Sequence, residues 1–310
     1  MSGKAIYCSF QAFYLPLHRT KVPPNRPAPV MSPAPSLSSL SHDESIALDD
    51  GGRLAVRVYG RRGRGAAPLA VHFHAGAFVA GDLGSGARVA GLLAEAGAVV
   101  VSVDYPLAPG RPFPAAVEAG HAALEWAWRE RGRLAGASAT LWVAGEEAGG
   151  NLAAALALMA RDRRHPPLAG QILFSPMLDA CVATASLRAA HAGPVGCRWA
   201  DGWHDYLAGA DDALHPYAAP GQALRLAGLP PTLLLTAEDD PLHDEACAYA
   251  QRLREAGVPV DRVVLEGGTG WPCSLLGAEA ERPAWADAVR DRLRGVLSAR
   301  QTVPARPRRP

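Results

Sequence analysis

The strongest constraint on the fold of this chain is an alternation of short apolar segments with segments of helical periodicity. The run Ala98–Asp104 reads Ala-Val-Val-Val-Ser-Val-Asp, which is typical of a buried parallel strand. In Pro114–Arg131 the residues Val117, Leu124 and Trp128 recur at helical spacing. Repeated β-α-β units imply a mostly parallel sheet with helices on both faces. We therefore predict an α/β fold.

The same patterns predict the other elements. Strands are expected at Ser45–Leu48, Leu54–Tyr59, Leu69–His74, Thr140–Ala144, Gln171–Phe174, Thr232–Thr236 and Asp261–Leu265. Helices are expected at Ser85–Ala96, Gly150–Arg161, Leu242–Glu255 and Pro283–Ser298. The first two strands flank Asp49-Asp-Gly-Gly52, which is typical of an antiparallel hairpin. Ligands of such sheets bind beyond the carboxyl ends of the strands, so we expect the chemistry in the loops that follow them.

The two ends of the chain differ from this central part. Residues 1–43 are rich in Pro and Ser without a sustained period, so we expect a disordered leader. Residues 44–299 are expected to form the folded domain, with an irregular, partly helical insert at 181–229. Residues 300–310 are a basic, Pro-rich tail for which we also expect disorder.

Composition excludes several classes of protein. With 31 Lys and Arg against 30 Asp and Glu, the chain lacks the positive charge of a nucleic-acid binder. The five cysteines form no C-x-x-C pair, so a zinc ribbon or a disulfide scaffold is not expected. The longest clean apolar run, Leu152–Ala160, is too short to span a bilayer. No small-residue cleavage site directly follows Ala5–Leu17, so we expect a cytoplasmic protein.

Four motifs lie in the loops after the expected strands. They are His74-Ala-Gly-Ala-Phe78, Asp104-Tyr-Pro-Leu-Ala-Pro109, Gly145-Glu-Glu-Ala-Gly-Gly-Asn151 and Thr236-Ala-Glu-Asp-Asp240-Pro-Leu. They resemble, in order, the HGGGF oxyanion loop, the DYRLAPE segment, the GDSAGGN elbow and the acid loop of the hormone-sensitive-lipase-like branch of the α/β-hydrolases, also called the GDXG lipolytic family. The resemblance runs from about residue 45 to residue 298.

This resemblance implies an α/β-hydrolase fold with a small helical cap and hydrolysis of carboxylic esters. In that reaction a Ser attacks the carbonyl, a His takes its proton and an Asp orients the His. Backbone N–H groups stabilise the oxyanion, and the resemblance assigns this role to His74, Gly76 and Ala148 together with Ala75 and Ala77. The last two replace glycines, and their Cβ atoms resist a positive φ and crowd the site.

Two of the three positions that the resemblance assigns to catalysis carry other residues. Glu147 stands at the nucleophile position, after Glu146, and no other G-x-S-x-G occurs in the sequence. Gly270 stands at the His position, so only the acid, Asp240, matches. Because removal of a triad member leaves a residual acceleration of ~10³–10⁴-fold over water, we expect that efficient serine-esterase catalysis is lost.

Glu147 has three alternative interpretations. Its carboxylate could displace an alkyl leaving group, as the Asp of dehalogenases and epoxide hydrolases does. It could act as a general base. It could also be a relic that fills an inactive pocket, which we favour. Being longer than Ser, Glu147 could extend toward Asp240 and share a proton with it; alternatively, water fills that gap and Asp240 caps the helix that follows.

Other side chains near these motifs allow weaker inferences. His72 and His74 alternate on one strand and could hold a metal with Glu147. Because family members use His at the position of His74 for loop structure, we expect no metal and no other cofactor. Three aromatic residues of the insert are expected to line the pocket: Trp199, Trp203 and Tyr206.

The sequence thus leaves two functions open. The favoured one is a pseudoenzyme that binds a small apolar acyl-type ligand or a partner protein. The alternative is a weak or non-classical hydrolase of a small carboxylic ester, with Glu147 in a new role. The final strand and helix could support a homodimer.

Overall fold

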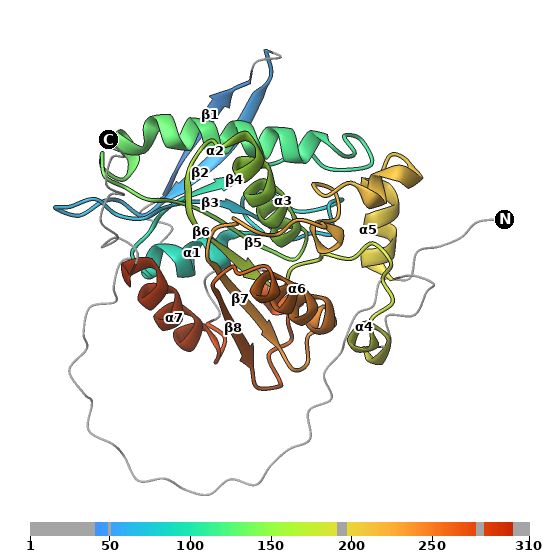
Figure 1. Ribbon diagram of the computed structural model, residues 1–310. Helices are drawn as coiled ribbons and strands as arrows, with labels where there is room; N and C mark the ends of the chain where they lie inside the picture. Colours follow the sequence, from blue (N-terminus) through green and yellow to red (C-terminus); the bar gives the residue numbers. More distant parts are fainter. Residues whose placement is uncertain (1–40, 49–50, 191–196, 277–281, 300–310) are drawn as a thin grey trace, which may run out of the picture. The chain divides into compact units, whose positions relative to one another are not determined.

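The computed structural model describes residues 41–48, 51–190, 197–276 and 282–299 (Figure 1). Within these residues the chain forms an eight-stranded sheet with the order β1-β2-β4-β3-β5-β6-β7-β8. β2 pairs antiparallel with both β1 and β4, and the other neighbours are parallel. The predicted mostly parallel α/β sheet is therefore confirmed.

The strands are β1 (Ser41–Ala47), β2 (Arg53–Tyr59), β3 (Leu69–Phe73), β4 (Val99–Val103), β5 (Leu141–Glu146), β6 (Leu168–Phe174), β7 (Thr232–Ala237) and β8 (Val260–Leu265). The helices are α1 (Ala87–Glu95), α2 (Ala115–Leu134), α3 (Ala148–Arg163), α4 (Ala185–Ala189), α5 (Arg198–Tyr206), α6 (His243–Glu255) and α7 (Ala286–Ala299).

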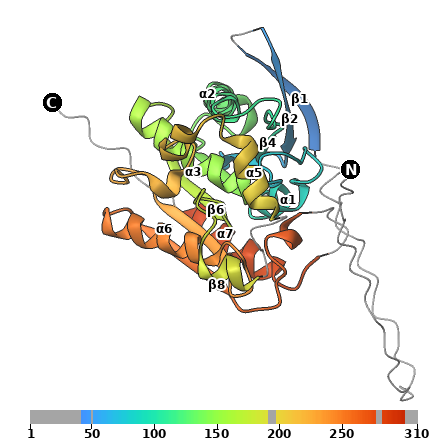
Figure 2. The same ribbon diagram turned by 90° about the vertical axis from the view of Figure 1, so that its right-hand side faces the viewer.

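Helices cover both faces of the sheet, as Figures 1 and 2 show. One apolar cluster joins α2, α3 and α6 to side chains such as Val71 and Phe73 of β3. The other joins α1 and α7 to the opposite face, which includes Ala70. Side chains of a strand alternate between faces, and in β3 all five residues are buried, because both faces are covered.

The predicted elements are found with shifted boundaries. β1 begins at Ser41, four positions before the expected start, because Ser41 already pairs with Tyr59. The segment 181–229 lies between β6 and β7 and contains α4 and α5. Residues 1–40, 49–50 and 300–310 lie outside the described residues, so the predicted disorder of the two ends and the hairpin turn stay predictions.

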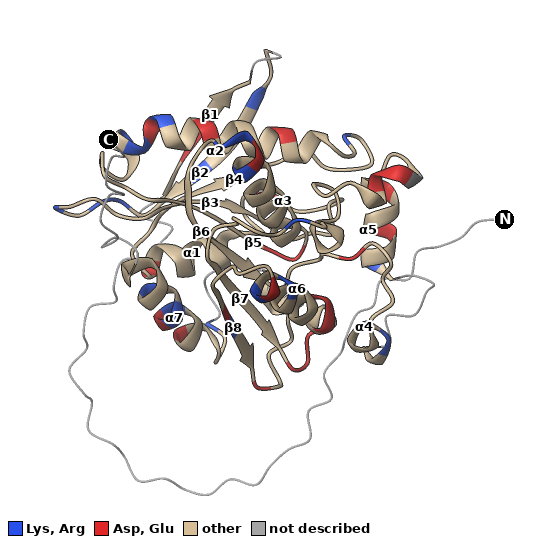
Figure 3. Ribbon diagram, viewed as in Figure 1, with Lys and Arg blue, Asp and Glu red and all other residues tan. Residues whose placement is uncertain are grey.

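Charges are mixed along the surface helices. Cationic and anionic residues are interspersed on α2 and on α7 (Figure 3). In the part of the chain that the structure describes, the helices do not reach the length and apolarity that a bilayer crossing requires.

Candidate active site

Glu147 occupies a sharp turn between a strand and a helix. β5 ends at Glu146 and α3 begins at Ala148, which leaves Glu147 alone at the turn with φ 52° and ψ −114°. A positive φ in a residue other than Gly costs roughly 1–3 kcal/mol and is retained at functional sites. A Cβ on Gly145 would lie 2.1 Å from the carbonyl oxygen of Gly149, so the turn needs glycine to close. This strand-turn-helix is the conformation of a nucleophile elbow.

The loop after β3 faces this elbow. A Cβ on Gly76 (φ 134°) would lie 1.9 Å from the carbonyl oxygen of Ala80, so only glycine fits there. Ala77 has φ 49°, so this alanine adopts the conformation that its Cβ was expected to resist. Ala75 does not have a positive φ and is fully buried. The loop therefore holds two residues other than glycine at positive φ, since Phe78 has φ 67°. We call residues 74–78 the oxyanion loop after the family motif that they resemble.

The carboxylate of Glu147 receives hydrogen bonds from four donors. Oε2 accepts the N–H of Gly76 at 2.6 Å and the N–H of Ala77 at 3.0 Å. Oε1 accepts Nη2–H of Arg198 at 2.6 Å and Nε1–H of Trp199 at 2.7 Å. We call these four donor groups the carboxylate cradle. The Glu147 side chain within it is 1% exposed.

Helix α5 lies directly on the oxyanion loop. Tyr206 stacks on Phe78 with ring centroids 3.9 Å apart, and Trp203 contacts the same ring at 5.1 Å. A Cβ on Gly202 would lie 2.2 Å from the carbonyl oxygen of Ala77, so this glycine permits the close approach. Trp203 and Tyr206, which were expected to line a pocket, are buried and pack against this loop.

A second buried acid lies beside the first. Glu146 and His72 are both fully buried, and Oε2 of Glu146 lies 2.6 Å from Nε2 of His72. The other ring nitrogen lies 3.0 Å from the hydroxyl oxygen of Ser102. Oε1 of Glu146 accepts the N–H of Ala75 at 3.3 Å. Glu146 and Glu147 thus accept three successive N–H groups of the oxyanion loop.

His74 serves the structure of the loop. Its ring stacks on Tyr105 at 4.3 Å, its Nδ1 lies 2.8 Å from the carbonyl oxygen of Ala75, and the Tyr105 hydroxyl donates to the His74 carbonyl. Burial lowers the pKa of His74, which favours the neutral ring. Among the described residues no cluster of three or more His, Cys, Asp or Glu has the arrangement of a metal site.

Asp240 lies between β7 and α6. Its Oδ2 accepts the Thr236 hydroxyl at 2.7 Å and its Oδ1 accepts the N–H of Leu242 at 2.9 Å, just before the helix. Burial raises the pKa of Asp240, and the bond from Thr236 offsets part of the increase. Helix α6 has Leu242 at its N-cap position without a side-chain cap, so Asp240 binds the residue before the helix and does not cap it.

Gly270 is held next to the acid loop. Its N–H donates to Oδ2 of Asp239 at 2.8 Å, and the Thr269 hydroxyl donates to the other oxygen of the same carboxylate. A Cβ on Gly270 would meet Ser274 at 3.8 Å, an ordinary contact, although φ is 68°. A Cβ therefore fits at this position, although a residue other than glycine would be strained by the positive φ.

The interpretation that Glu147 extends toward Asp240 is wrong in this structure. Both oxygens of Glu147 accept hydrogen bonds from the cradle, whereas Asp240 accepts from Thr236 and Leu242. The sequence analysis missed Arg198, which supplies the charged donor. No motif surrounds Arg198, and 51 residues separate it from Glu147. The one indication that this segment belongs to the site was the neighbouring aromatic residue Trp199.

Comparison with known proteins agrees with this geometry. The sequence pattern of the α/β-hydrolase fold family matches residues 70–269. The chain belongs to this family. In this α/β-hydrolase, 200 residues (63% of the chain) are 40% identical to the esterase LipI of Mycobacterium tuberculosis. They cover 62% of LipI, so the chain spans less than two thirds of that relative's length.

Two further comparisons cover more of the α/β-hydrolase chain. An arylesterase of Saccharolobus solfataricus is 34% identical over 223 residues, which are 71% of this chain and 72% of that protein. The crystal structure of the esterase LipW from Mycobacterium marinum superimposes with a TM-score of 0.69 at 34% identity and covers 83% of this chain and 81% of the other. The α/β-hydrolase prediction is thereby confirmed.

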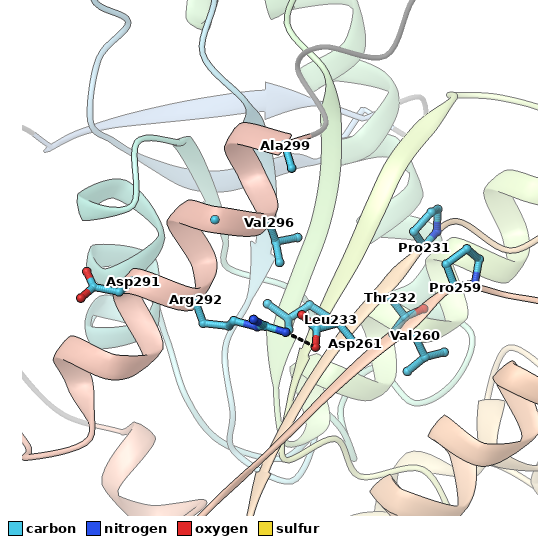
Figure 4. A pocket seen from close by; sticks show the side chains of 11 residues that line it. Pro231, Thr232, Leu233, Pro259, Val260, Asp261, Asp291, Arg292, Val296 and Ala299 are labelled. Atoms are coloured by element: carbon cyan, nitrogen blue, oxygen red, sulfur yellow. Dashed lines mark hydrogen bonds and ion pairs between the residues drawn. The ribbon is translucent and has the colours of Figure 1, made fainter.

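Two clefts of this α/β-hydrolase lie away from Glu147. One of about 570 Å³ opens at the amino ends of β7 and β8 against α7, where Arg292 forms an ion pair with Asp261 (Figure 4). The other, of about 760 Å³, lies between the turn that follows β1 and the start of α2. Neither includes a cradle residue in its lining. Ligands of this sheet type bind at the carboxyl ends of the strands, opposite the first cleft.

Proposed function

We propose that this protein is a hydrolase-derived pseudoenzyme that has lost serine-esterase catalysis and binds a small apolar acyl-type ligand or a partner protein. One observation carries the proposal. The N–H groups of Gly76 and Ala77, which in the family would receive the oxyanion, donate to the protein's own Glu147. A substrate carbonyl oxygen therefore has no access to these two donors.

The same geometry disfavours a new catalytic role for Glu147. A carboxylate has about four lone-pair positions, and Glu147 accepts four hydrogen bonds. A general base or a nucleophile needs a free lone pair directed at the substrate. Gly270, at the position that the resemblance assigns to His, offers no side chain as a base. Because relatives of this chain are named as esterases, weak hydrolase activity remains the alternative function.

A further property of the proposed pseudoenzyme concerns its assembly. A homodimer through the last strand and helix is proposed because β8 ends the sheet.

Ester hydrolysis by the purified protein tests the proposal. With p-nitrophenyl acetate and butyrate we expect no turnover above that of the heat-denatured protein. An esterase relative, assayed in parallel, provides the scale. Turnover within about a hundredfold of that relative would exclude the pseudoenzyme, since loss of a triad residue costs more than this. A fluorophosphonate probe should leave the protein unlabelled; stoichiometric labelling of any Ser would identify an overlooked nucleophile.

A further inference from the structure

The donors around Glu147 are arranged for one planar carboxylate. Two N–H groups of the oxyanion loop meet one oxygen, and the side chains of Arg198 and Trp199 meet the other. We propose that the carboxylate cradle is a monocarboxylate-binding site that the protein fills with its own Glu147. A free carboxylate of the size of acetate takes the site once this side chain is removed. This inference rests on the proposed function, in which Glu147 is no catalytic group.

The geometry selects a carboxylate over other small ligands. A monatomic anion can meet only one of the two donor pairs, because the pairs address two different oxygens. A neutral amide presents an NH₂ group to one donor pair, so it would leave those donors unsatisfied inside a buried site. Hydrogen bonds to an ionised acceptor are shorter and stronger than neutral ones, and the bonds to Gly76 and Arg198 are both 2.6 Å.

The formal charge of the carboxylate cradle without Glu147 is positive. Arg198 is its only formally charged donor, and its guanidinium lies over the Trp199 ring at 4.6 Å. The nearest other acid, Glu146, is engaged by His72 and by the N–H of Ala75. When the Glu147 side chain is absent, Arg198 and the backbone N–H groups are left without an anion.

In the wild-type protein the tethered carboxylate excludes a free one. A group tethered by a short segment acts at an effective concentration on the order of millimolar or above. A second carboxylate entering beside Glu147 would also meet a like charge without a donor. A native ligand of the wild-type protein therefore does not use the cradle, which excludes a free fatty acid anchored there by its carboxylate.

Thermal unfolding of Glu147→Gly in acetate tests the inference. Glycine suits the positive φ at this position and vacates the cradle. We expect acetate at ten times its dissociation constant to raise the Tm of this variant by about 2–5 °C. Acetamide and sodium chloride at equal concentration should leave its Tm unchanged, and acetate should leave the wild-type Tm unchanged. Glu147→Ala probed with formate is a second variant that retains a Cβ.

A matched pair of tryptophan variants locates the binding. In the Glu147→Gly background, Trp199→Phe removes one cradle donor and should weaken acetate binding about tenfold. Trp203→Phe on the same helix should leave acetate binding unchanged, because that ring packs on Phe78 outside the cradle. Equal Tm increases in acetate and acetamide, no increase in either Glu147 variant with its probe, or equal losses in the two tryptophan variants would overturn the inference.

The two proposals fail separately. Esterase turnover by the wild type would overturn the proposed function and leave the acetate result standing. Indifference of the Glu147 variants to carboxylates would overturn the cradle as a ligand site, while the wild type would still show no turnover.

Discussion

Arg198 lies 2.6 Å from Glu147 and joins helix α5 of the insert to the elbow of the central sheet. Glu147 is 1% exposed and Arg198 is 42% exposed, so the pair spans the boundary between the interior and solvent. An acid buried this deeply requires donors, because an unpaired charge is costly in a low dielectric. The contact therefore anchors α5, and with it the aromatic cluster on Phe78, to the oxyanion loop.

Replacement of Arg198 should loosen this anchor. Arg198→Met removes the only charged donor to Glu147, and we expect the free energy of unfolding to fall by about 1–2 kcal/mol. The partial exposure of Arg198 places the value near the low end for charged hydrogen bonds. Urea unfolding measures the loss. Arg188→Met in α4 is the matched control, since Arg188 is exposed and its side chain donates to the carbonyl of Ala183; equal effects of the two variants would contradict the anchor.

The buried pair of His72 and Glu146 should show strong coupling. His72→Leu or Glu146→Leu alone leaves a buried partner unpaired and should cost about 3–5 kcal/mol. The double variant should cost clearly less than the sum, because it removes both polar groups at once. A double-mutant cycle from urea unfolding gives the coupling free energy. Strict additivity would show that the 2.6 Å contact contributes nothing to stability.

Glu245 should make stability depend on pH. It lies in the first turn of α6 and accepts the N–H of Leu178, and burial raises its pKa well above the usual 4.5, aided by the charge of Asp179. The folded state therefore binds this proton more tightly than the unfolded state, and the wild type loses stability as pH rises above about 4.5.

The variant Glu245→Gln removes that titration and keeps an acceptor for Leu178. We expect it to match the wild type near pH 4 and to exceed it at pH 8, by about 1.4 kcal/mol for each unit of pKa increase. Urea unfolding at both pH values measures the difference. Glu255→Gln at the exposed end of the same helix should show no such divergence. A constant difference across pH would contradict the raised pKa.

Restoring the missing groups should recover part of an esterase. Glu147→Ser removes the carboxylate that occupies the N–H groups of the oxyanion loop. Gly270→His adds a base beside the acid loop, where a Cβ would lie 3.8 Å from Ser274. We expect the double variant to hydrolyse p-nitrophenyl acetate at least about tenfold faster than Glu147→Ser alone, because Ser needs its base. Glu147→Ala with Gly270→His is the control without a nucleophile. Equal rates for all three would show that Asp240 or the loop no longer supports catalysis.

The sequence allowed prediction of the sheet because strands depend on local pattern, as the β-branched run now seen as β4 shows. The elbow at Glu147 was expected from the resemblance of Gly145–Asn151 to a family motif, and its glycines fit the observed turn. The direction of the Glu147 side chain stayed open between two alternatives, because the N–H groups that hold it come from the oxyanion loop, 71 and 70 residues away in the chain.

The order of apolar and polar residues determines where strands and helices form, since these depend on neighbours within a few positions of the chain. Tertiary packing decides which donors surround the Glu147 carboxylate. Arg198 and Trp199 reach it from an insert without regular pattern, and that insert can approach the carbonyl oxygen of Ala77 because Gly202 has no Cβ. Long-range contacts of this kind depend on how two separately formed units fit, and no local periodicity encodes that fit.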